Sequence, residues 1–277
     1  MENILEVRNL RVWDLNSDKV LIANNSFDLR RSSCLAIVGE SGSGKSITCR
    51  SIMRLNGSSL RQSGEILFKG ENLTTLSEKK MRRKRGRKLC MILQNGMSAF
   101  DPSCVIGVHL KETLAEHFDC DWKKNEIEEK MKLAMESVML KNPIEIMNKY
   151  PHQLSGGMLQ RIMIALAIVL EPDIIIADEP TTALDTVSQF EVVEQFIQLR
   201  KKMGCSMIFI SHDLGVVRKI ADEVLVMKDG EIVERGPTEA IFLKPEHKYT
   251  KYLVSTRLAL SENFKKLMRG ETIVAES

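Results

Sequence analysis

The chain has little in its composition that would tie it directly to a membrane or to a nucleic acid. Its longest apolar run, residues 162–170, stops at Glu171 and is far shorter than the roughly 20 residues that a membrane-spanning helix needs. The net charge is only +3, with 40 basic and 37 acidic residues spread along 277 positions. Such a balance does not require a nucleic-acid partner. We expect any connection to a membrane to be made through another protein.

The sequence also lacks closely spaced cysteine pairs and the pattern of a signal peptide. The six cysteines form no Cys-x-x-Cys pair, which argues against a zinc site and against a disulfide framework. We expect reduced, mostly buried thiols at Cys34, Cys49, Cys90, Cys104, Cys120 and Cys205. The first residues contain no basic segment followed by an apolar core, the pattern of a secretory signal peptide. We therefore expect a cytoplasmic protein.

The most informative stretch that is present is a glycine-rich loop after the apolar residues 35–38. Its pattern, Gly-x-x-x-x-Gly-Lys-Ser, predicts a strand, a loop and a helix whose backbone N–H groups bind nucleotide phosphates. We expect Lys45 to reach the β- and γ-phosphates and the Ser46 hydroxyl to bind Mg²⁺. The candidate residues are Gly39, Glu40, Ser41, Gly42, Ser43, Gly44, Lys45, Ser46 and Ile47. The alternative is a surface turn rich in glycine and serine.

Two carboxylates follow a second apolar run, at residues 174–177 after Asp173. Because this run is β-branched and does not alternate, it predicts a central parallel strand buried on both faces. Asp178 is then placed to hold Mg²⁺ through water, and Glu179 to orient and deprotonate an attacking water. A helix N-cap pair is the alternative, which Pro180 weakens.

Polar residues also follow two other predicted strands. Gln94 comes after residues 89–93, and His212 comes after residues 206–210. Ligands of α/β sheets bind at the carboxyl ends of the parallel strands, so we expect both side chains at this ligand-binding edge, in line with Glu179 at an equivalent strand end. A lone histidine is more often structural, but because Gln94 and Glu179 lie at equivalent strand ends, we expect His212 to contact the γ-phosphate.

A second anion site is predicted where Ser155, Gly156 and Gly157 open a strongly apolar helix that runs to about residue 170. Trp13 ends a predicted hairpin of residues 4–13 and 20–30, where it either stacks on a base or fills a gap in the sheet. The residues alone favour the gap.

The remaining patterns are less specific. The basic run at residues 82–88 has no interleaved aromatics, so we expect a solvated loop rather than a nucleic-acid site. Residues 105–150 predict helices with an apolar face. An amphipathic helix is predicted at residues 186–203, and the last strands are predicted to form a hairpin around an Asp-Gly turn.

In their order, the motifs resemble those of the nucleotide-binding subunits of ABC transporters. They are the phosphate loop, Gln94, Leu154-Ser155-Gly156-Gly157, Asp178-Glu179, Ala183-Leu184-Asp185 and His212. The resemblance covers about residues 4–256 and implies an α/β, ABC-type P-loop NTPase. It implies a RecA-like core with an antiparallel β subdomain (1–97 and 171–245), a helical subdomain (98–170) and a C-terminal tail (246–277).

The resemblance also assigns roles to single residues. It makes Glu179, His212, Gln94 and Lys45 catalytic, and Ser46, Gln94 and Asp178 the residues that bind Mg²⁺. It identifies Ser155 to Gln160 as the signature segment and Asp185 as the D-loop acid, both contacting ATP. Trp13 falls where the family usually places the aromatic that stacks on adenine, which reverses the preference given above.

The partners implied by the resemblance are proteins of a transport complex. A second ATPase subunit, identical or paralogous, pairs head to tail with the chain, so that the signature segment of one completes the nucleotide site of the other. Two membrane-spanning permeases hold the pair at the cytoplasmic face of the membrane, and an extracytoplasmic solute-binding protein acts indirectly. No nucleic-acid partner is implied.

Three segments narrow the resemblance to the oligopeptide, dipeptide and nickel importers. They are the phosphate loop Gly39 to Ser46, Tyr150 to Met158 and Glu246-His247-Lys248-Tyr249-Thr250. No cysteine follows Cys205, and Leu159 stands where peptide types tend to have arginine, which favours nickel or a nickel–metallophore complex over peptides. A non-transport ABC ATPase is disfavoured because the chain has neither a long coiled-coil insertion nor a second ATPase unit.

Overall fold

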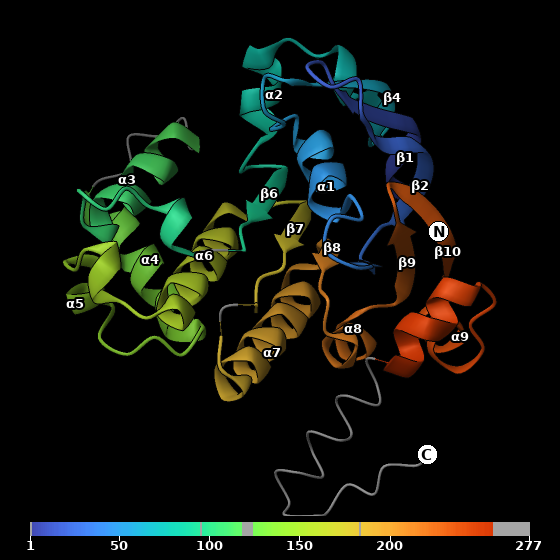
Figure 1. Ribbon diagram of the computed structural model, residues 1–277. Helices are drawn as coiled ribbons and strands as arrows, with labels where there is room; N and C mark the ends of the chain where they lie inside the picture. Colours follow the sequence, from blue (N-terminus) through green and yellow to red (C-terminus); the bar gives the residue numbers. More distant parts are fainter. Residues whose placement is uncertain (1, 95, 118–123, 183, 257–277) are drawn as a thin grey trace, which may run out of the picture.

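Two β-sheets organise the chain in the computed structural model, which describes residues 2–94, 96–117, 124–182 and 184–256 (Figure 1). The larger sheet has the strand order β10-β9-β3-β8-β7-β6. Its strands are β3 (Cys34–Val38), β6 (Leu89–Ile92), β7 (Ile174–Asp178), β8 (Ser206–Ile210), β9 (Glu223–Lys228) and β10 (Glu231–Pro237). Neighbouring strands are parallel except in the β9–β10 hairpin, as predicted for a doubly covered α/β sheet.

The smaller sheet is antiparallel and has the order β2-β1-β4-β5. It contains β1 (Asn3–Asp14), β2 (Val20–Arg30), β4 (Leu60–Phe68) and β5 (Glu71–Asn72). The hairpin predicted near the N-terminus is confirmed by the pairing of β1 with β2. Together the two sheets give the α/β fold with an antiparallel β region that the sequence predicts.

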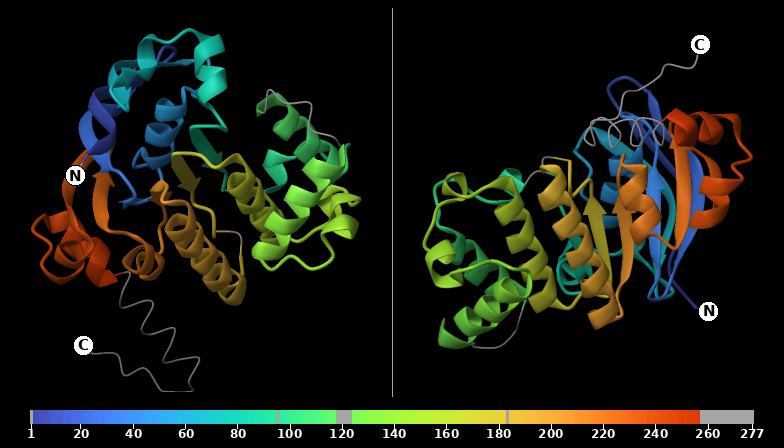
Figure 2. Two further views of the ribbon diagram at one scale, coloured as in Figure 1. Left: turned by 180° about the vertical axis from the view of Figure 1, so that it is seen from behind. Right: turned by 90° about the horizontal axis from the view of Figure 1, so that it is seen from below.

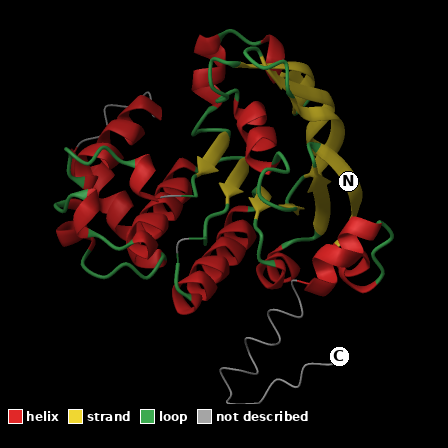
Figure 3. Cartoon of the chain, viewed as in Figure 1, coloured by secondary structure: helices red, strands yellow, loops and turns green. Residues whose placement is uncertain are grey.

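Helices cover both faces of the larger sheet, and one group of helices lies to one side of the molecule (Figures 2 and 3). The labelled helices are α1 (Lys45–Met53), α2 (Glu78–Lys84), α3 (Ile106–His117), α4 (Lys124–Ser137), α5 (Pro143–Met147), α6 (Gly156–Leu170), α7 (Thr186–Met203), α8 (Leu214–Ile220) and α9 (Thr238–Leu243), and residues 248–256 are also helical. The side group is α3 to α6. In the part of the chain that the structure describes, no helix is long and apolar enough to cross a bilayer. The exact subdomain boundaries stay a prediction.

The central strands are apolar throughout because they are buried on both faces. Ile174 and Ile176 of β7 share an apolar cluster with α1 and the smaller sheet, whereas Ile175 and Ala177 share one with α6 and α7. All five residues of β7 are buried. A strand covered in this way gains from apolar side chains at every position, which explains the absence of alternation.

The apolar face predicted within residues 105–150 is confirmed as core. Met131 and Met135 of α4 are fully buried, and Ile127 and Ala134 are nearly so. Among the described cysteines, Cys34, Cys49 and Cys205 are buried thiols and the other two are half-buried. The expectation for Cys120 falls outside the described residues.

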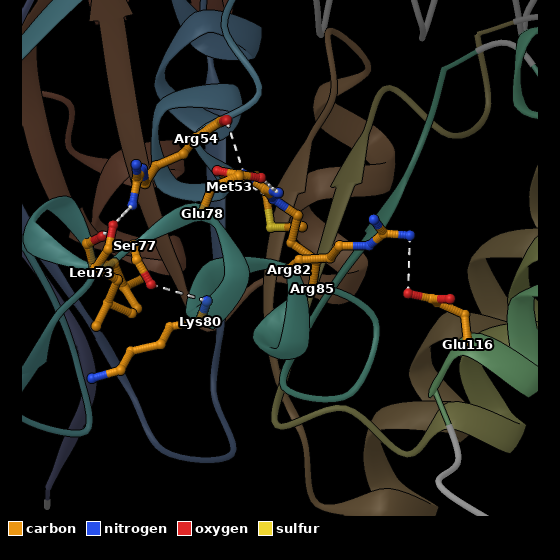
Figure 4. A network of polar contacts seen from close by, with 10 residues as sticks. Met53, Arg54, Leu73, Ser77, Glu78, Lys80, Arg82, Arg85 and Glu116 are labelled. Atoms are coloured by element: carbon orange, nitrogen blue, oxygen red, sulfur yellow. Dashed lines mark hydrogen bonds and ion pairs between the residues drawn. The ribbon is translucent and has the colours of Figure 1, made fainter.

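The prediction of a solvated loop for the basic run is only partly right, because residues 86–88 form a turn and positions 82, 83 and 88 are exposed, whereas the rest of the run is helical or half-buried. Residues 82–84 form the last turn of α2, which Ser77 caps by accepting the Lys80 N–H at 3.4 Å. Arg85 is 17% exposed at its side chain, pairs with Glu78 and donates to the carbonyl oxygens of Met53 and Arg54 at 2.8 and 3.1 Å (Figure 4). The guanidinium of Arg85 therefore binds groups of the fold instead of facing solvent. Two of these groups belong to Met53 and Arg54, which are distant from Arg85 in the sequence.

Arg235 joins the two sheets. Its guanidinium lies 2.8 Å from Asp28 of β2 and 2.8 Å from Glu223 of β9, and only 24% of its side chain is exposed. Burial works to lower the pKa of Arg235, but the hydrogen bonds to the two carboxylates outweigh it and raise the pKa. The arginine is therefore a permanent cation between two acids of different sheets.

We expect Arg235→Ala to lower the free energy of unfolding by about 1–3 kcal/mol, because two partly buried carboxylates would lose their shared partner. Urea unfolding followed by circular dichroism measures the change. Arg218→Ala, at an exposed position of α8, is the matched control and should stay within about 0.5 kcal/mol of the parent. Equal midpoints for the two variants would contradict this role of Arg235.

Candidate functional site

The phosphate loop predicted from the sequence lies between β3 and α1, and its glycines are required by close packing. A Cβ atom on Gly39 would lie 2.2 Å from the carbonyl oxygen of Met227. A Cβ atom on Gly44 would lie 2.4 Å from the side chain of Ile22, and Gly44 also has a left-handed φ of +100°. A larger residue at either position would force the loop away from the sheet.

Lys45 is held against this loop by two hydrogen bonds. Its Nζ donates to the carbonyl oxygen of Gly39 at 3.0 Å and to that of Glu40 at 2.8 Å, and the residue is only 5% exposed. Because α1 begins at Lys45, free N–H groups of the helix and the ammonium group occupy the same end of the loop. This end is suited to an anion.

Ser46 and Asp178 bring two oxygen atoms together across α1 and β7. The Ser46 hydroxyl donates to Oδ1 of Asp178 at 2.8 Å, and Asp178 is 3% exposed. Burial raises the pKa of the Asp178 carboxyl, although the Ser46 hydrogen bond and the charge of Arg50 act in the opposite direction. A nearby cation would favour the ionised form. A hydroxyl and a carboxylate are donors that suit Mg²⁺.

Three side chains meet at one oxygen of Glu179. Its Oε2 accepts hydrogen bonds from Gln94 Nε2 at 3.1 Å and from Thr182 Oγ1 at 3.0 Å, and it lies 3.5 Å from His212 Nδ1. Gln94, Glu179 and His212 follow β6, β7 and β8, which are adjacent in the sheet. The structure thus brings together the three residues that the sequence predicts to lie at equivalent strand ends.

The backbone of Glu179 has an uncommon conformation. Its φ is +46°, in the left-handed region that residues with a side chain rarely adopt, and its N–H donates to the carbonyl oxygen of Ile210 at 3.1 Å. Such a conformation costs free energy and persists where the surroundings fix it. Here it accompanies a turn immediately after β7, where Asp178 and Glu179 contact different partners.

The signature segment lies elsewhere. Ser155 caps α6 by accepting the N–H of Met158 at 3.2 Å, and a Cβ atom on Gly157 would lie 3.6 Å from Leu184. Gln160 is 2% exposed, and in the described part of the chain its Nε2 has no hydrogen-bond partner. Between described residues, no hydrogen bond or ion pair joins Ser155 to the phosphate loop.

Trp13 and Asp185 have local contacts instead. Trp13 is half-buried in β1, opposite Val20 and Arg61, and the guanidinium of Arg11 lies 5.8 Å from the centre of its ring. Asp185 caps α7 by accepting the Ser188 N–H at 3.0 Å. Contacts of Trp13, Asp185 and the signature segment with ATP stay predictions. Ala183 lies outside the described residues.

The sequence analysis missed Thr182 and Arg50. Thr182 donates to the candidate base, and Arg50 acts on Asp178 through its charge. For Thr182 the signal was available, since a hydroxyl three residues after an acid in a Pro-containing turn can reach back to it. Arg50 lies on α1, one turn after Ser46, so it faces the same side of the helix.

Comparison with known proteins agrees with the motifs. The family profile described as ABC transporter matches residues 22–182. The ATP-binding protein CntD of the metal-staphylopine import system of Staphylococcus aureus is 47% identical over 97% of this chain and 98% of its own length. The dipeptide transport ATP-binding protein DppD of Bacillus subtilis is 44% identical over 92% of this chain and 77% of its own length.

Solved structures agree on the fold. The ATP-binding cassette MJ0796, described as a dimer in a post-hydrolysis state with ADP and Pi, matches with a TM-score of 0.76 at 23% identity, over 84% of this chain and 98% of its own. The cbiO1 protein of Clostridium perfringens matches with a TM-score of 0.73 at 23% identity, over 96% of this chain and 100% of its own. At such identities the likeness concerns the fold.

A phosphate loop, a cluster around Glu179 and extensive identity with import ATPases therefore agree with one another. The chain belongs to the ABC transporter family and is an ATPase of its nickel- and peptide-import branch.

Proposed function

We propose that residues 39–46 bind the phosphates of ATP and that Glu179 is the general base of hydrolysis. The observation that carries the proposal is the convergence of Gln94, Thr182 and His212 on Oε2 of Glu179. Two donors directed at one oxygen fix the orientation of the carboxylate before any water is bound. Preorganisation of this kind is what a general base requires.

In the proposed reaction, Glu179 accepts a proton from a water molecule whose oxygen forms a bond to the γ-phosphorus. The bond between that phosphorus and the bridging oxygen of ADP breaks, which releases ADP and phosphate. Lys45 exchanges its two loop carbonyls for phosphate oxygens, so its charge faces the anion. His212, next to the same carboxylate, is positioned to contact the γ-phosphate.

Ser46 and Asp178 are the residues that would hold Mg²⁺, and Gln94 is the third predicted contributor. Their fit is supported by the 2.8 Å approach of the Ser46 and Asp178 oxygens and by the burial of the carboxylate. When bound, the ion would neutralise negative charge on the phosphates.

We further propose that ATP is held between two ATPase subunits in a head-to-tail pair. Ser155 and Gly156 at the start of α6 are exposed and separate from the chain's own phosphate loop, which leaves them accessible to a neighbouring subunit. The N-terminus of a helix as long as α6 is suited to bind a phosphate. Two membrane-spanning permeases would hold the pair at the cytoplasmic face of the membrane, with a solute-binding protein on the other side.

The proposed cargo is nickel or a nickel–metallophore complex. The support is the 47% identity with a metal-staphylopine import ATPase along nearly the whole of both chains. Peptides are the second candidate, because dipeptide and oligopeptide import ATPases are 43–44% identical over about nine tenths of this chain.

Uptake by cells that contain the complete transporter separates these cargoes. We expect nickel-63 to accumulate when staphylopine is supplied and not when the parental chain is replaced by Glu179→Gln. An excess of dipeptide should leave this uptake unchanged. Uptake of labelled dipeptide without uptake of nickel would contradict the metal assignment and favour the second candidate.

We expect Glu179→Gln to lower ATP turnover in the assembled transporter by roughly 10²–10⁴-fold, the usual contribution of a positioned general base. ATP binding should remain, since the amide keeps the size of the carboxylate and its single oxygen can still accept the hydrogen bonds of Gln94 and Thr182. Release of phosphate measures turnover. Glu171→Gln changes an exposed carboxylate near the other end of β7 and should turn over ATP like the parent. Parental turnover by Glu179→Gln would rule out this base.

We expect Lys45→Ala to weaken ATP binding by roughly 10- to 150-fold, because a charge-assisted contact of about 1.5–3 kcal/mol is removed. Calorimetric titration of the full-length chain with ATP measures the dissociation constant. Lys111→Ala, at an exposed position of α3, is the control and should bind like the parent. Equal affinity in both variants would refute the proposed phosphate loop.

A further inference from the structure

A tyrosine near the C-terminal end of the described chain contacts the phosphate loop. Oη of Tyr249 accepts the N–H of Glu40 at 3.0 Å, across a separation of 209 residues. The tyrosine is 7% exposed, and its ring belongs to the apolar cluster that includes Val38 of β3 and Val226 of β9. The hydroxyl is therefore the polar end of a side chain that is otherwise part of the core.

The segment that carries Tyr249 is itself fixed to the sheet. The carboxylate of Glu234 in β10 accepts the N–H of Glu246 at 2.8 Å and that of His247 at 3.0 Å. Burial works to raise the pKa of Glu234, but these backbone hydrogen bonds outweigh it and lower the pKa. The following residues, 248–256, are helical. The position of the hydroxyl is thus set by β10 and the core, not by the loop that it contacts.

The peptide groups around Glu40 are held from both sides. The N–H of Glu40 donates to Tyr249, while its carbonyl oxygen accepts from Lys45 Nζ at 2.8 Å and from the Ser43 N–H at 3.2 Å. If Lys45 turns to a bound phosphate, the carbonyl loses one of these contacts. The hydrogen bond from Glu40 to the tyrosine hydroxyl remains, and it limits the freedom that the loop would otherwise gain.

We propose that Tyr249 is a positioning residue for the phosphate loop, and that its hydroxyl keeps the start of the loop in the conformation that binds ATP. The proposal rests on the proposed function of residues 39–46. It gives the segment from Glu246 to residue 254 a part in nucleotide affinity, although Tyr249 is 209 residues away from Glu40 in sequence and the segment contributes no predicted catalytic group.

Tyr249→Phe tests the proposal because it removes the hydroxyl and keeps the ring in the core. We expect the dissociation constant for ATP of the full-length chain to rise about 2- to 10-fold, the usual effect of losing one hydrogen bond. The amide hydrogen of Glu40 should exchange faster by a similar factor. In the assembled transporter, KM for ATP should rise while kcat stays at the parental value.

The matched control is Tyr252→Phe, in the same helical segment. Tyr252 is 58% exposed, so removal of its hydroxyl should leave ATP affinity, Glu40 exchange and the unfolding temperature unchanged. If Tyr249→Phe lowered kcat together with ATP affinity while the amide hydrogen of Glu40 exchanged at the parental rate, the role of the tyrosine would be merely structural and the proposal would be overturned.

Comparison with Lys45→Ala separates failure of this inference from failure of the proposed function. If Lys45→Ala loses ATP binding while Tyr249→Phe matches the parent in affinity and in Glu40 exchange, the tyrosine has no positioning role and the phosphate loop assignment stands. If Lys45→Ala binds ATP like the parent, the loop assignment fails, and the role of Tyr249 fails with it.

Discussion

Burial of β7 on both faces is the constraint on which the rest of the site depends. Because α1 and the smaller sheet cover one face and α6 and α7 cover the other, the strand cannot shift without opening two apolar clusters. Its end therefore holds Asp178 against Ser46 and Glu179 against Gln94 with little freedom. Burial of carboxylates costs free energy. The two acids keep their places because burial of the apolar side chains of β7 stabilises the strand that carries them.

The parts of the fold that follow from local patterns could be predicted from the sequence. Runs of apolar, β-branched residues gave the central strands, and residues at their ends, Gln94, Glu179 and His212, could be grouped because parallel strands share an edge. Arg85 and Tyr249 could not be predicted in this way. Their partners are backbone groups distant in the sequence: the carbonyl oxygens of residues 53 and 54 for Arg85, and the N–H of Glu40 for Tyr249. Every residue except proline has such backbone groups, so the residue types do not indicate these contacts.

The contacts of Ser155, Gly156 and Trp13 with ATP stay predictions, each for a physical reason. Ser155 and Gly156 lie on a surface whose proposed function depends on a second subunit, and Trp13 has contacts within its own sheet that explain it without a ligand. The cargo is harder to predict than the contacts with ATP, since no residue of an ATPase subunit needs to touch the transported solute. Family membership therefore says more about the reaction than about the solute.

The resting position of Lys45 has a consequence for selectivity among anions. With its ammonium group already solvated by two carbonyl dipoles of its own loop, the site presents an internally compensated cation rather than a bare one. An incoming ion must offer more than those dipoles do. A species with a single negative charge gains little in that exchange, whereas a polyphosphate that engages the ammonium and the helix N–H groups together gains at several points at once. The loop thereby discriminates by charge density before it discriminates by shape.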